Sequence, residues 1–247
     1  MNNKIIFGLH AAQAAMEKQT ENIETLWIQD SRHDERVNEI LQWAKRKGIP
    51  VQMLSRQALD QHTHQAVHQG IVVVLKGNKE YSEKDLVSLI ESAAPNVLLL
   101  ILDGVQDPHN VGACLRTANG LGVNAVIAPK DKSAGLTPTA RKVACGAAEL
   151  TPFITVTNLA RTLKYLKEQG VWLIGLEGKA EQFLHQLDLK GSYALVMGNE
   201  GQGLRHLTRE HCDYWAKLPL QGGIESYNVS AATAMALYEV RRQQGFH

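Results

Sequence analysis

The chain has 247 residues, of which 44% are hydrophobic, and a formal net charge of +1 at pH 7. This length suits one or two globular domains, and the near-neutral charge gives no bulk signal of nucleic-acid binding. The longest wholly aliphatic run, residues 97–102, is too short to span a bilayer, and no secretory signal opens the chain. Because the cysteines Cys114, Cys145 and Cys212 form no CxxC pair, we expect a reduced, cytoplasmic protein with no membrane partner.

Short apolar runs alternate with helical patterns over the first 75 residues. Strands are predicted at 5–8, 24–28, 51–54 and 70–75, and helices at 10–18, 34–47 and 55–61. The helix at 34–47 has apolar residues at i, i+3, i+4 and i+7, the spacing of an amphipathic helix. The alternation predicts a small α/β domain at residues 1–76.

Three histidines, His62, His64 and His68, lie close together near the end of this domain. No cysteine and no clustered carboxylate completes a ligand set around them. We therefore favour a polar turn before the last strand and expect no metal.

A polar stretch at residues 76–85 predicts a linker, which we place at 77–94 with a short helix at 85–92. The second domain, residues 95–247, begins with the apolar run 97–102, typical of a strand covered on both faces. Further strands are predicted at 123–128, 153–156, 171–175, 193–197 and 214–218, and helices at 137–148, 158–169 and 228–242. The pattern predicts a parallel sheet with helices on both faces.

Polar and glycine-rich stretches follow three of these strands: residues 107–118 (DPHNVGACLRTA), 197–203 (MGNEGQG) and 219–230 (PLQGGIESYNVS). Open α/β sheets bind ligands at the carboxyl ends of their strands. Asn110 is predicted to cap the first helix, and Arg116 follows six residues later, where its planar guanidinium suits a phosphate. The alternative is ordinary structure, with Ser226 or Asn228 capping the last helix and Arg116 paired with a surface carboxylate.

The three stretches, in this order, resemble the motifs of the SpoU, or TrmH-type, RNA ribose 2′-O-methyltransferases. This resemblance implies a C-terminal α/β domain with a deep trefoil knot of the SPOUT type. It also implies that the small N-terminal α/β domain is an RNA-binding domain resembling ribosomal protein L30e, since residues 66–71 are similar to its end. Over its full length the chain resembles members that methylate a guanosine ribose in the peptidyl-transferase loop of 23S ribosomal RNA.

The resemblance further implies the cofactor S-adenosylmethionine, no metal, a homodimer, and 23S RNA or the assembling large ribosomal subunit as partner. Backbone around four residues would hold the cofactor: Gly198, Leu218, Leu220 and Tyr227. Tyr227 departs from the family, because relatives commonly have leucine there.

The catalytic residues that the resemblance implies are Arg116, Asn110, Glu200, Ser226 and Asn228. A guanidinium has a pKa above about 12 and seldom gives up its proton, so Arg116 is better suited to clamp a phosphate or stabilise an alkoxide. Glu200 is the more conventional candidate for the general base.

Three other functions are weighed against this one. A dinucleotide-dependent oxidoreductase is disfavoured, because the glycines at 198–203 have the spacing GxxGxG and not GxGxxG. The remaining alternatives are methylation of transfer RNA and a non-catalytic RNA-binding or ribosome-assembly factor with the same fold. Binding of S-adenosylmethionine separates the methyltransferases from the oxidoreductase and from the non-catalytic factor.

Overall fold

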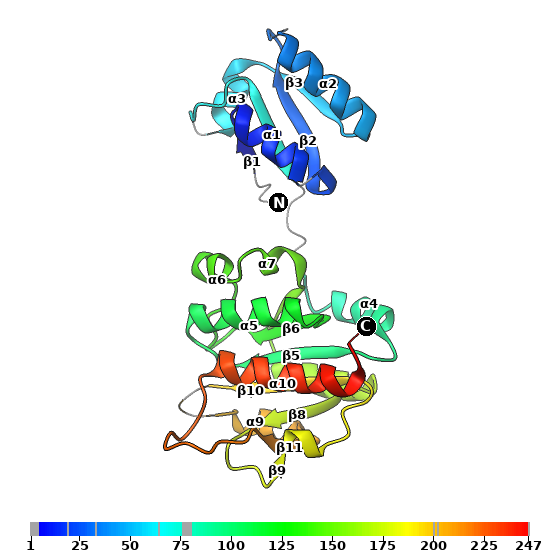
Figure 1. Cartoon of the computed structure of the whole chain (residues 1–247), viewed down its shortest axis with the longest axis vertical. Coiled ribbons are helices and arrows are strands. Elements are labelled where there is room, and N and C mark those ends of the chain that lie inside the picture. The colour runs from blue at the N-terminus through cyan, green and yellow to red at the C-terminus, as the bar shows by residue number, and fades with distance from the viewer. Residues whose placement is uncertain are drawn as a thin grey trace. The chain divides into compact units, whose positions relative to one another are not determined.

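The computed structural model describes residues 5–18, 20–32, 34–63, 65–75, 81–199, 201 and 203–246. The chain divides into two compact units, residues 1–79 and 80–247 (Figure 1). Within the described residues, no helix combines the length and the apolar character needed to cross a bilayer.

The first unit is built on a four-stranded mixed sheet with the order β1-β4-β2-β3. Strand β4 is antiparallel to β1 and to β2, and β2 is parallel to β3. The strands are β1 Ile5–Phe7, β2 Ile23–Gln29, β3 Val51–Leu54 and β4 Ile71–Leu75. The helices are α1 Leu9–Lys18, α2 Glu35–Lys47 and α3 Arg56–His62, with a 3₁₀ turn at Thr20–Asn22. The predicted alternation of strands and helices is confirmed.

Helix α2 shows why these elements form where they do. It starts after Asp34, whose Oδ1 accepts a hydrogen bond from the backbone N–H of Val37 at 3.2 Å. Val37, Ile40 and Ala44 on its apolar stripe are buried in the core of the first unit. Hydrophobic periodicity and capping thus agree on the same helix.

Two histidines of the first unit, His62 and His68, make structural contacts. His68 is buried, and its Nε2 lies 2.9 Å from Asp60 Oδ1 while its Nδ1 accepts from the N–H of Gly70 at 3.0 Å. The ring of His62 lies 4.5 Å from that of Trp27. His64 is outside the described residues, and no group of three metal-ligand side chains is found within them.

The described strands of the second unit form a seven-stranded sheet with the order β7-β6-β5-β10-β8-β11-β9. All neighbouring strands are parallel, so their carboxyl ends meet at one edge. The strands are β5 Leu98–Asp103, β6 Ala125–Pro129, β7 Phe153–Val156, β8 Trp172–Leu176, β9 Gln182–Phe183, β10 Tyr193–Gly198 and β11 Tyr214–Lys217. The parallel sheet that the sequence predicted is confirmed.

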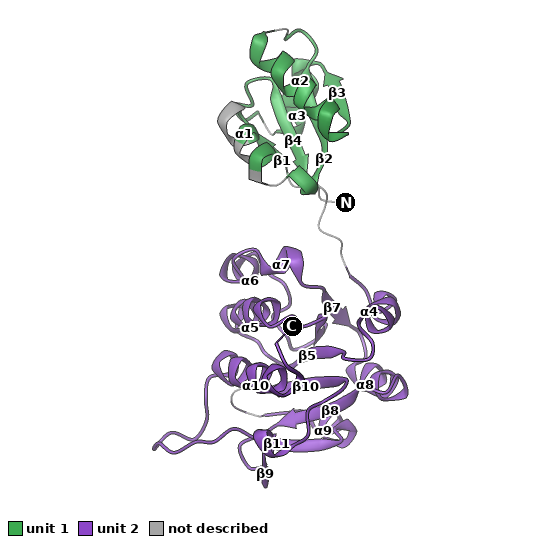
Figure 2. Cartoon of the chain, turned by 45° about the vertical axis from the view of Figure 1, so that its right-hand side comes forward, with its two compact units in different colours: residues 1–79 green, residues 80–247 purple. Residues whose placement is uncertain are grey.

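Helices cover both faces of this sheet (Figure 2). One core lies between the sheet and the side of α5, α6, α7 and α10, and the other lies on the side of α4 and α8. The helices are α4 Asp85–Ala93, α5 Pro108–Gly120, α6 Pro138–Val143, α7 Ala147–Leu150, α8 Leu159–Glu168, α9 His206–His211 and α10 Val229–Gln244, with a 3₁₀ turn at Leu184–Gln186. Helix α4 lies within the predicted linker 77–94, and its Leu86 and Ile90 pack in the core of the second unit.

Two local predictions are wrong. Asn110 lies inside α5, and the N-cap is Asp107, whose Oδ1 accepts from the N–H of His109 at 2.8 Å. Pro108 explains the earlier start, because its fixed φ suits the first helical position. The helix predicted at 137–148 is two helices, interrupted where Cys145 and Gly146 have φ of 51° and 91°.

Candidate functional site

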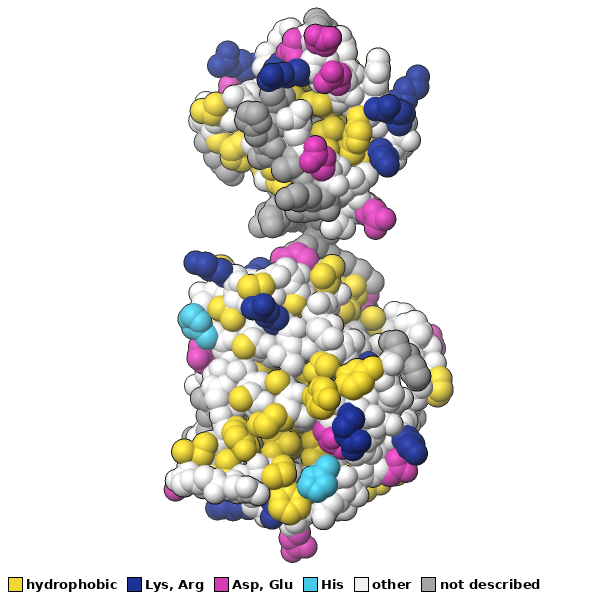
Figure 3. Space-filling view, viewed as in Figure 1, with side chains coloured by type: hydrophobic (Ala, Val, Ile, Leu, Met, Phe, Trp, Pro, Cys, Tyr) yellow, Lys and Arg dark blue, Asp and Glu magenta, His cyan; other side chains and the backbone are white. Residues whose placement is uncertain are grey.

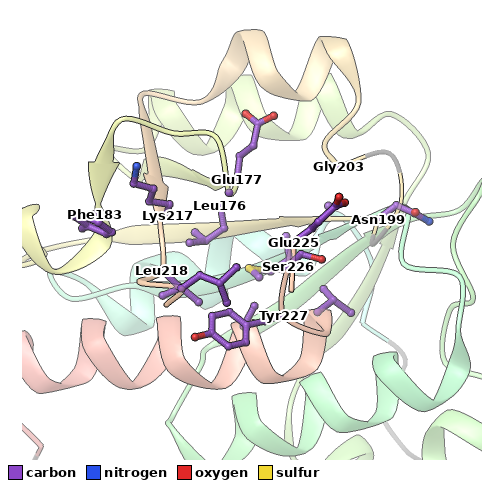
Figure 4. A pocket seen from close by; sticks show the side chains of 16 residues that line it. Leu176, Glu177, Phe183, Asn199, Gly203, Lys217, Leu218, Glu225, Ser226 and Tyr227 are labelled. Carbon is purple, nitrogen blue, oxygen red and sulfur yellow. The ribbon is translucent and has the colours of Figure 1, made fainter. Parts of the chain in front are cut away.

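A cavity of about 460 Å³ lies at the carboxyl ends of β8, β10 and β11 (Figure 4). This volume is within the range of roughly 300–1,000 Å³ typical of small-molecule sites. The walls come from residues 176–178 at the end of β8, 183 in β9, 197–199 and 203 around the end of β10, and 217, 218 and 220 at the end of β11. Residues 225–227 before α10, and 229 and 232 in its first turns, complete them. Two of the three motif stretches therefore meet at one cavity.

The residues predicted to hold a cofactor all lie in the walls of this cavity: Gly198, Leu218, Leu220 and Tyr227. Tyr227, where the resemblance led us to expect leucine, donates a hydrogen bond from its hydroxyl to the carbonyl of Pro219 at 2.8 Å. This bond closes the loop between β11 and α10 on itself. The phenol side chain thus has a structural partner that a leucine would lack.

The residues predicted to be catalytic are divided between the cavity and its surroundings. Ser226 lines the cavity. Asn228 Nδ2 donates to Asn110 Oδ1 at 3.0 Å, which joins the first motif to the third, and Asn228 also caps α10 through the N–H of Ser230. Arg116 is exposed on α5 outside the cavity walls, with Nη1 3.6 Å from Cys145 Sγ. Glu200 is outside the described residues.

The loop after β10 is held closed by its own backbone. Asn199 and Gly203 exchange two backbone hydrogen bonds of 3.0 and 2.9 Å. The Asn199 side chain donates to the carbonyl of Gly104 at 3.0 Å and accepts from the N–H of Gly201 at 2.8 Å. A Cβ on Gly198 would lie 2.4 Å from the carbonyl carbon of Gly203, so only glycine fits where the loop crosses the strand.

A buried ion pair anchors the same loop to β5, and sequence reasoning missed it. Asp103, fully buried at the end of β5, is paired with the guanidinium of Arg205 and accepts from the backbone N–H of Arg205 at 3.1 Å. Gly198 is the register partner of Asp103 on the neighbouring strand. A single carboxylate at the end of an otherwise aliphatic run was the signal available in the sequence.

Replacing Arg205 with alanine is expected to lower the free energy of unfolding by about 2 kcal/mol. Removing one partner of a buried pair costs roughly 3–5 kcal/mol. We expect less because the Arg205 side chain is 40% exposed. Urea denaturation would measure the loss, with Arg242→Ala, which removes a more exposed partner of Glu239, as a control expected to lose clearly less stability. Equal losses in the two variants would contradict the anchoring role of Asp103.

The charged side chains in the cavity walls differ in how they are paired. Glu177 Oε2 forms an ion pair with Arg209 Nη2 at 2.9 Å. Lys217 Nζ lies 4.9 Å from the centre of the Phe183 ring, at cation–π distance. Glu177 follows the predicted strand at 171–175, and ligands bind at the carboxyl ends of such strands, so its position could have been predicted. It was missed because the stretch after this strand has no long glycine motif.

The cysteine thiols are expected to differ sharply in reactivity. Burial raises the pKa of Cys212 to about 12, so its thiolate, the form that reacts, is scarce at pH 8. Cys114 is buried, whereas Cys145 is exposed. Brief treatment with iodoacetamide at pH 8 followed by peptide mass mapping should find Cys145 labelled first. Labelling of Cys212 at a comparable rate would contradict the environment described for it.

Comparisons with known proteins agree with these motifs. The profile of the SpoU rRNA Methylase family matches residues 97–238, and that of RNA 2′-O ribose methyltransferase substrate binding matches residues 5–81. The 23S rRNA (guanosine-2′-O-)-methyltransferase RlmB of Coxiella burnetii is 48% identical over 98% of this chain and 96% of its own. The protein of the same name from Pseudomonas aeruginosa is 49% identical over 97% of this chain and 96% of its own.

Solved structures share the fold. The SpoU methyltransferase AviRb from Streptomyces viridochromogenes, in complex with the cofactor AdoMet, superimposes with a TM-score of 0.65 and 20% identity, covering 98% of this chain and 90% of its own. The A. aeolicus TrmH/SpoU tRNA modifying enzyme has a TM-score of 0.55 and 28% identity, covering 65% of this chain and 83% of its own. With ordered motifs, a shared fold and near-full-length relatives in agreement, the chain belongs to the SpoU rRNA methylase family.

Proposed function

We propose that the chain transfers a methyl group from S-adenosylmethionine to the ribose 2′-hydroxyl of a guanosine in 23S ribosomal RNA. The observation that carries the proposal is the cavity at the ends of β8, β10 and β11, whose walls are the loops of the second and third motifs. The full-length similarity to RlmB proteins supports guanosine and 23S RNA as the substrate.

The cavity walls fit such a cofactor. Apolar side chains, among them Leu176, Leu218 and Val229, offer a surface for an adenine ring, while backbone at Gly198 is open to close approach. When bound, the cofactor supplies an electrophilic methyl group on a sulfonium.

The chain's own residues must position the hydroxyl and accept its proton, because a ribose hydroxyl is a weak nucleophile at neutral pH. We propose that Arg116 binds a substrate phosphate or stabilises the developing alkoxide, because its planar guanidinium presents several N–H donors to oxygen atoms. The bonded pair of Asn110 and Asn228, next to the cavity wall at Tyr227 and Val229, orients the ribose together with Ser226. Glu200 remains the proposed general base.

The two parts of the chain divide the task. We propose that residues 1–76 bind RNA with a fold resembling ribosomal protein L30e, that 77–94 connect the parts, and that 95–247 carry catalysis. The match of the substrate-binding profile to residues 5–81 supports this division. A cytoplasmic location follows from ribosomal RNA, or an assembling large subunit, as the partner.

We also propose a deep trefoil knot and a homodimer. Supporting the knot, α10 follows β11 in the chain but packs against α5, and Arg241 near its end donates to the carbonyl of Leu121 at 2.8 Å.

Supporting the dimer, α10 crosses a face on which hydrophobic side chains gather (Figure 3), with Met235, Tyr238 and Phe246 exposed. Light scattering after size exclusion should give twice the chain mass, and a monomer would overturn the dimer.

Methyl transfer from radiolabelled S-adenosylmethionine tests the function. The substrates are 23S, 16S and transfer RNA lacking modification, and resistance to alkaline cleavage locates the methylated ribose. Label at one guanosine of 23S RNA is expected, and label in transfer RNA alone would favour the substrate named for the A. aeolicus relative. Cofactor binding without transfer to any RNA would point to a missing partner or to an assembly intermediate as the substrate, whereas absence of cofactor binding would favour the non-catalytic assembly factor.

A further inference from the structure

Glu225 is a cavity residue to which the proposed reaction assigns no role. It precedes Ser226 in the loop between β11 and α10, and its side chain is exposed. Figure 4 shows its carboxylate directed toward the side of the cavity where Asn199 and Gly203 lie, away from Leu218 and Phe183. The acid group therefore faces the end of the cavity formed by the loop after β10.

The charge of Glu225 is not neutralised within the described part of the cavity. Glu177 is paired with Arg209 at 2.9 Å, and the ammonium of Lys217 lies over the ring of Phe183 at 4.9 Å. No described residue forms an ion pair or a side-chain hydrogen bond with Glu225. Of the two carboxylates in the described cavity wall, Glu225 is therefore the one without an ion-pair partner, and it is open to a ligand.

Methyl transfer changes the charge of the ligand by one unit. The S–CH₃ bond breaks with its electron pair left on sulfur, the methyl group joins the ribose oxygen, and the hydroxyl proton leaves to a base. A sulfonium with a permanent positive charge becomes a neutral thioether, S-adenosylhomocysteine. A nearby carboxylate attracts the positively charged sulfonium, but it has no charge–charge attraction to the neutral sulfur of the thioether.

We propose that Glu225 makes the cavity selective for the cationic cofactor over its neutral thioether product. The inference rests on the proposed function, since it requires that this cavity binds S-adenosylmethionine. The carboxylate strengthens cofactor binding before transfer and ceases to do so once the charge is gone, which favours exchange of product for fresh cofactor. Because Glu225 is exposed and screened by solvent, the effect on affinity is roughly three- to tenfold.

Isothermal titration calorimetry with three ligands of one skeleton tests the proposal. S-Adenosylmethionine has a sulfonium, sinefungin has a charged amine at the corresponding position, and S-adenosylhomocysteine has no charge there. In Glu225→Gln, dissociation constants for the two cations should rise about three- to tenfold, while that for S-adenosylhomocysteine should change less than about twofold. The matched control is Glu168→Gln, which makes the same charge change at the exposed end of α8, outside the cavity walls.

The outcomes separate the two proposals. A wild-type chain that binds none of the three ligands overturns the proposed function together with this inference. Wild-type binding with an equal loss for all three ligands in Glu225→Gln overturns the inference alone, because it indicates a contact with a group that the three ligands share. Unchanged affinities, or the same selective loss in Glu168→Gln, also overturn it, since neither would place the selective charge at Glu225.

Discussion

Changing Gly198 to alanine is expected to weaken S-adenosylmethionine binding about 100-fold. The added Cβ would lie 2.4 Å from the carbonyl carbon of Gly203 and 2.6 Å from the backbone nitrogen of Leu204. Backbone cannot turn aside as a flexible side chain does, so the loop after β10 must move away from the cavity. Overpacking of this kind costs roughly 1–3 kcal/mol, and each 1.4 kcal/mol is about tenfold in affinity. Titration calorimetry would measure the loss.

A neighbouring glycine provides the control for this substitution. A Cβ on Gly201, in the same loop, would have the Asn199 Oδ1 at 3.6 Å as its nearest neighbour, an ordinary contact. Gly201→Ala should therefore change cofactor affinity less than about threefold, since it requires no movement of the backbone. If both variants lost affinity equally, flexibility of the loop and not close approach at Gly198 would explain the effect.

Regular elements could be predicted from the sequence because their signals are local. The aliphatic run that became β5 and the periodic stripe of α2 are each contained within one element. The edge strand Gln182–Phe183 was missed because two residues carry no periodicity. The cap of α5 was misplaced by three residues because Asn110 and Asp107 both have capping side chains, and only Pro108 decides between them.

The candidate site could be predicted only in part, for a different reason. Glycine and polar residues after β10 and β11 indicated its position, because strand ends of a parallel sheet share an edge. The pairing of Asp103 with Arg205 joins residues 102 positions apart and depends on the strand order, which no local pattern encodes. The sequence likewise could not tell which wall carboxylate lacks an ion-pair partner. The structure shows that Glu177 pairs with Arg209, which leaves Glu225 without one.

Changing Arg116 to lysine is expected to lower kcat/KM for RNA methylation about 100-fold or more, although the positive charge is kept. Lysine is a point charge and lacks the planar fork that binds two phosphate oxygens or supports an alkoxide. Loss of one such stabilising donor costs roughly 10²–10³ in rate. Because Arg116 is exposed and outside the cavity walls, the dissociation constant for S-adenosylmethionine and the melting temperature should stay unchanged.

The pH dependence of the same variants separates the role of Arg116 from that of the general base. If Glu200 accepts the proton, activity rises with pH through the pKa of its carboxyl, and this limb should persist at low rate in Arg116→Lys and vanish in Glu200→Gln. If Arg116 were instead the base, the pH limb should persist in Glu200→Gln and should move to lower pH in Arg116→Lys, because a lysine loses its proton more readily than an arginine. A fully active Arg116→Lys enzyme would contradict the need for the fork. A Glu200→Gln enzyme with the wild-type profile would leave the proton to another group.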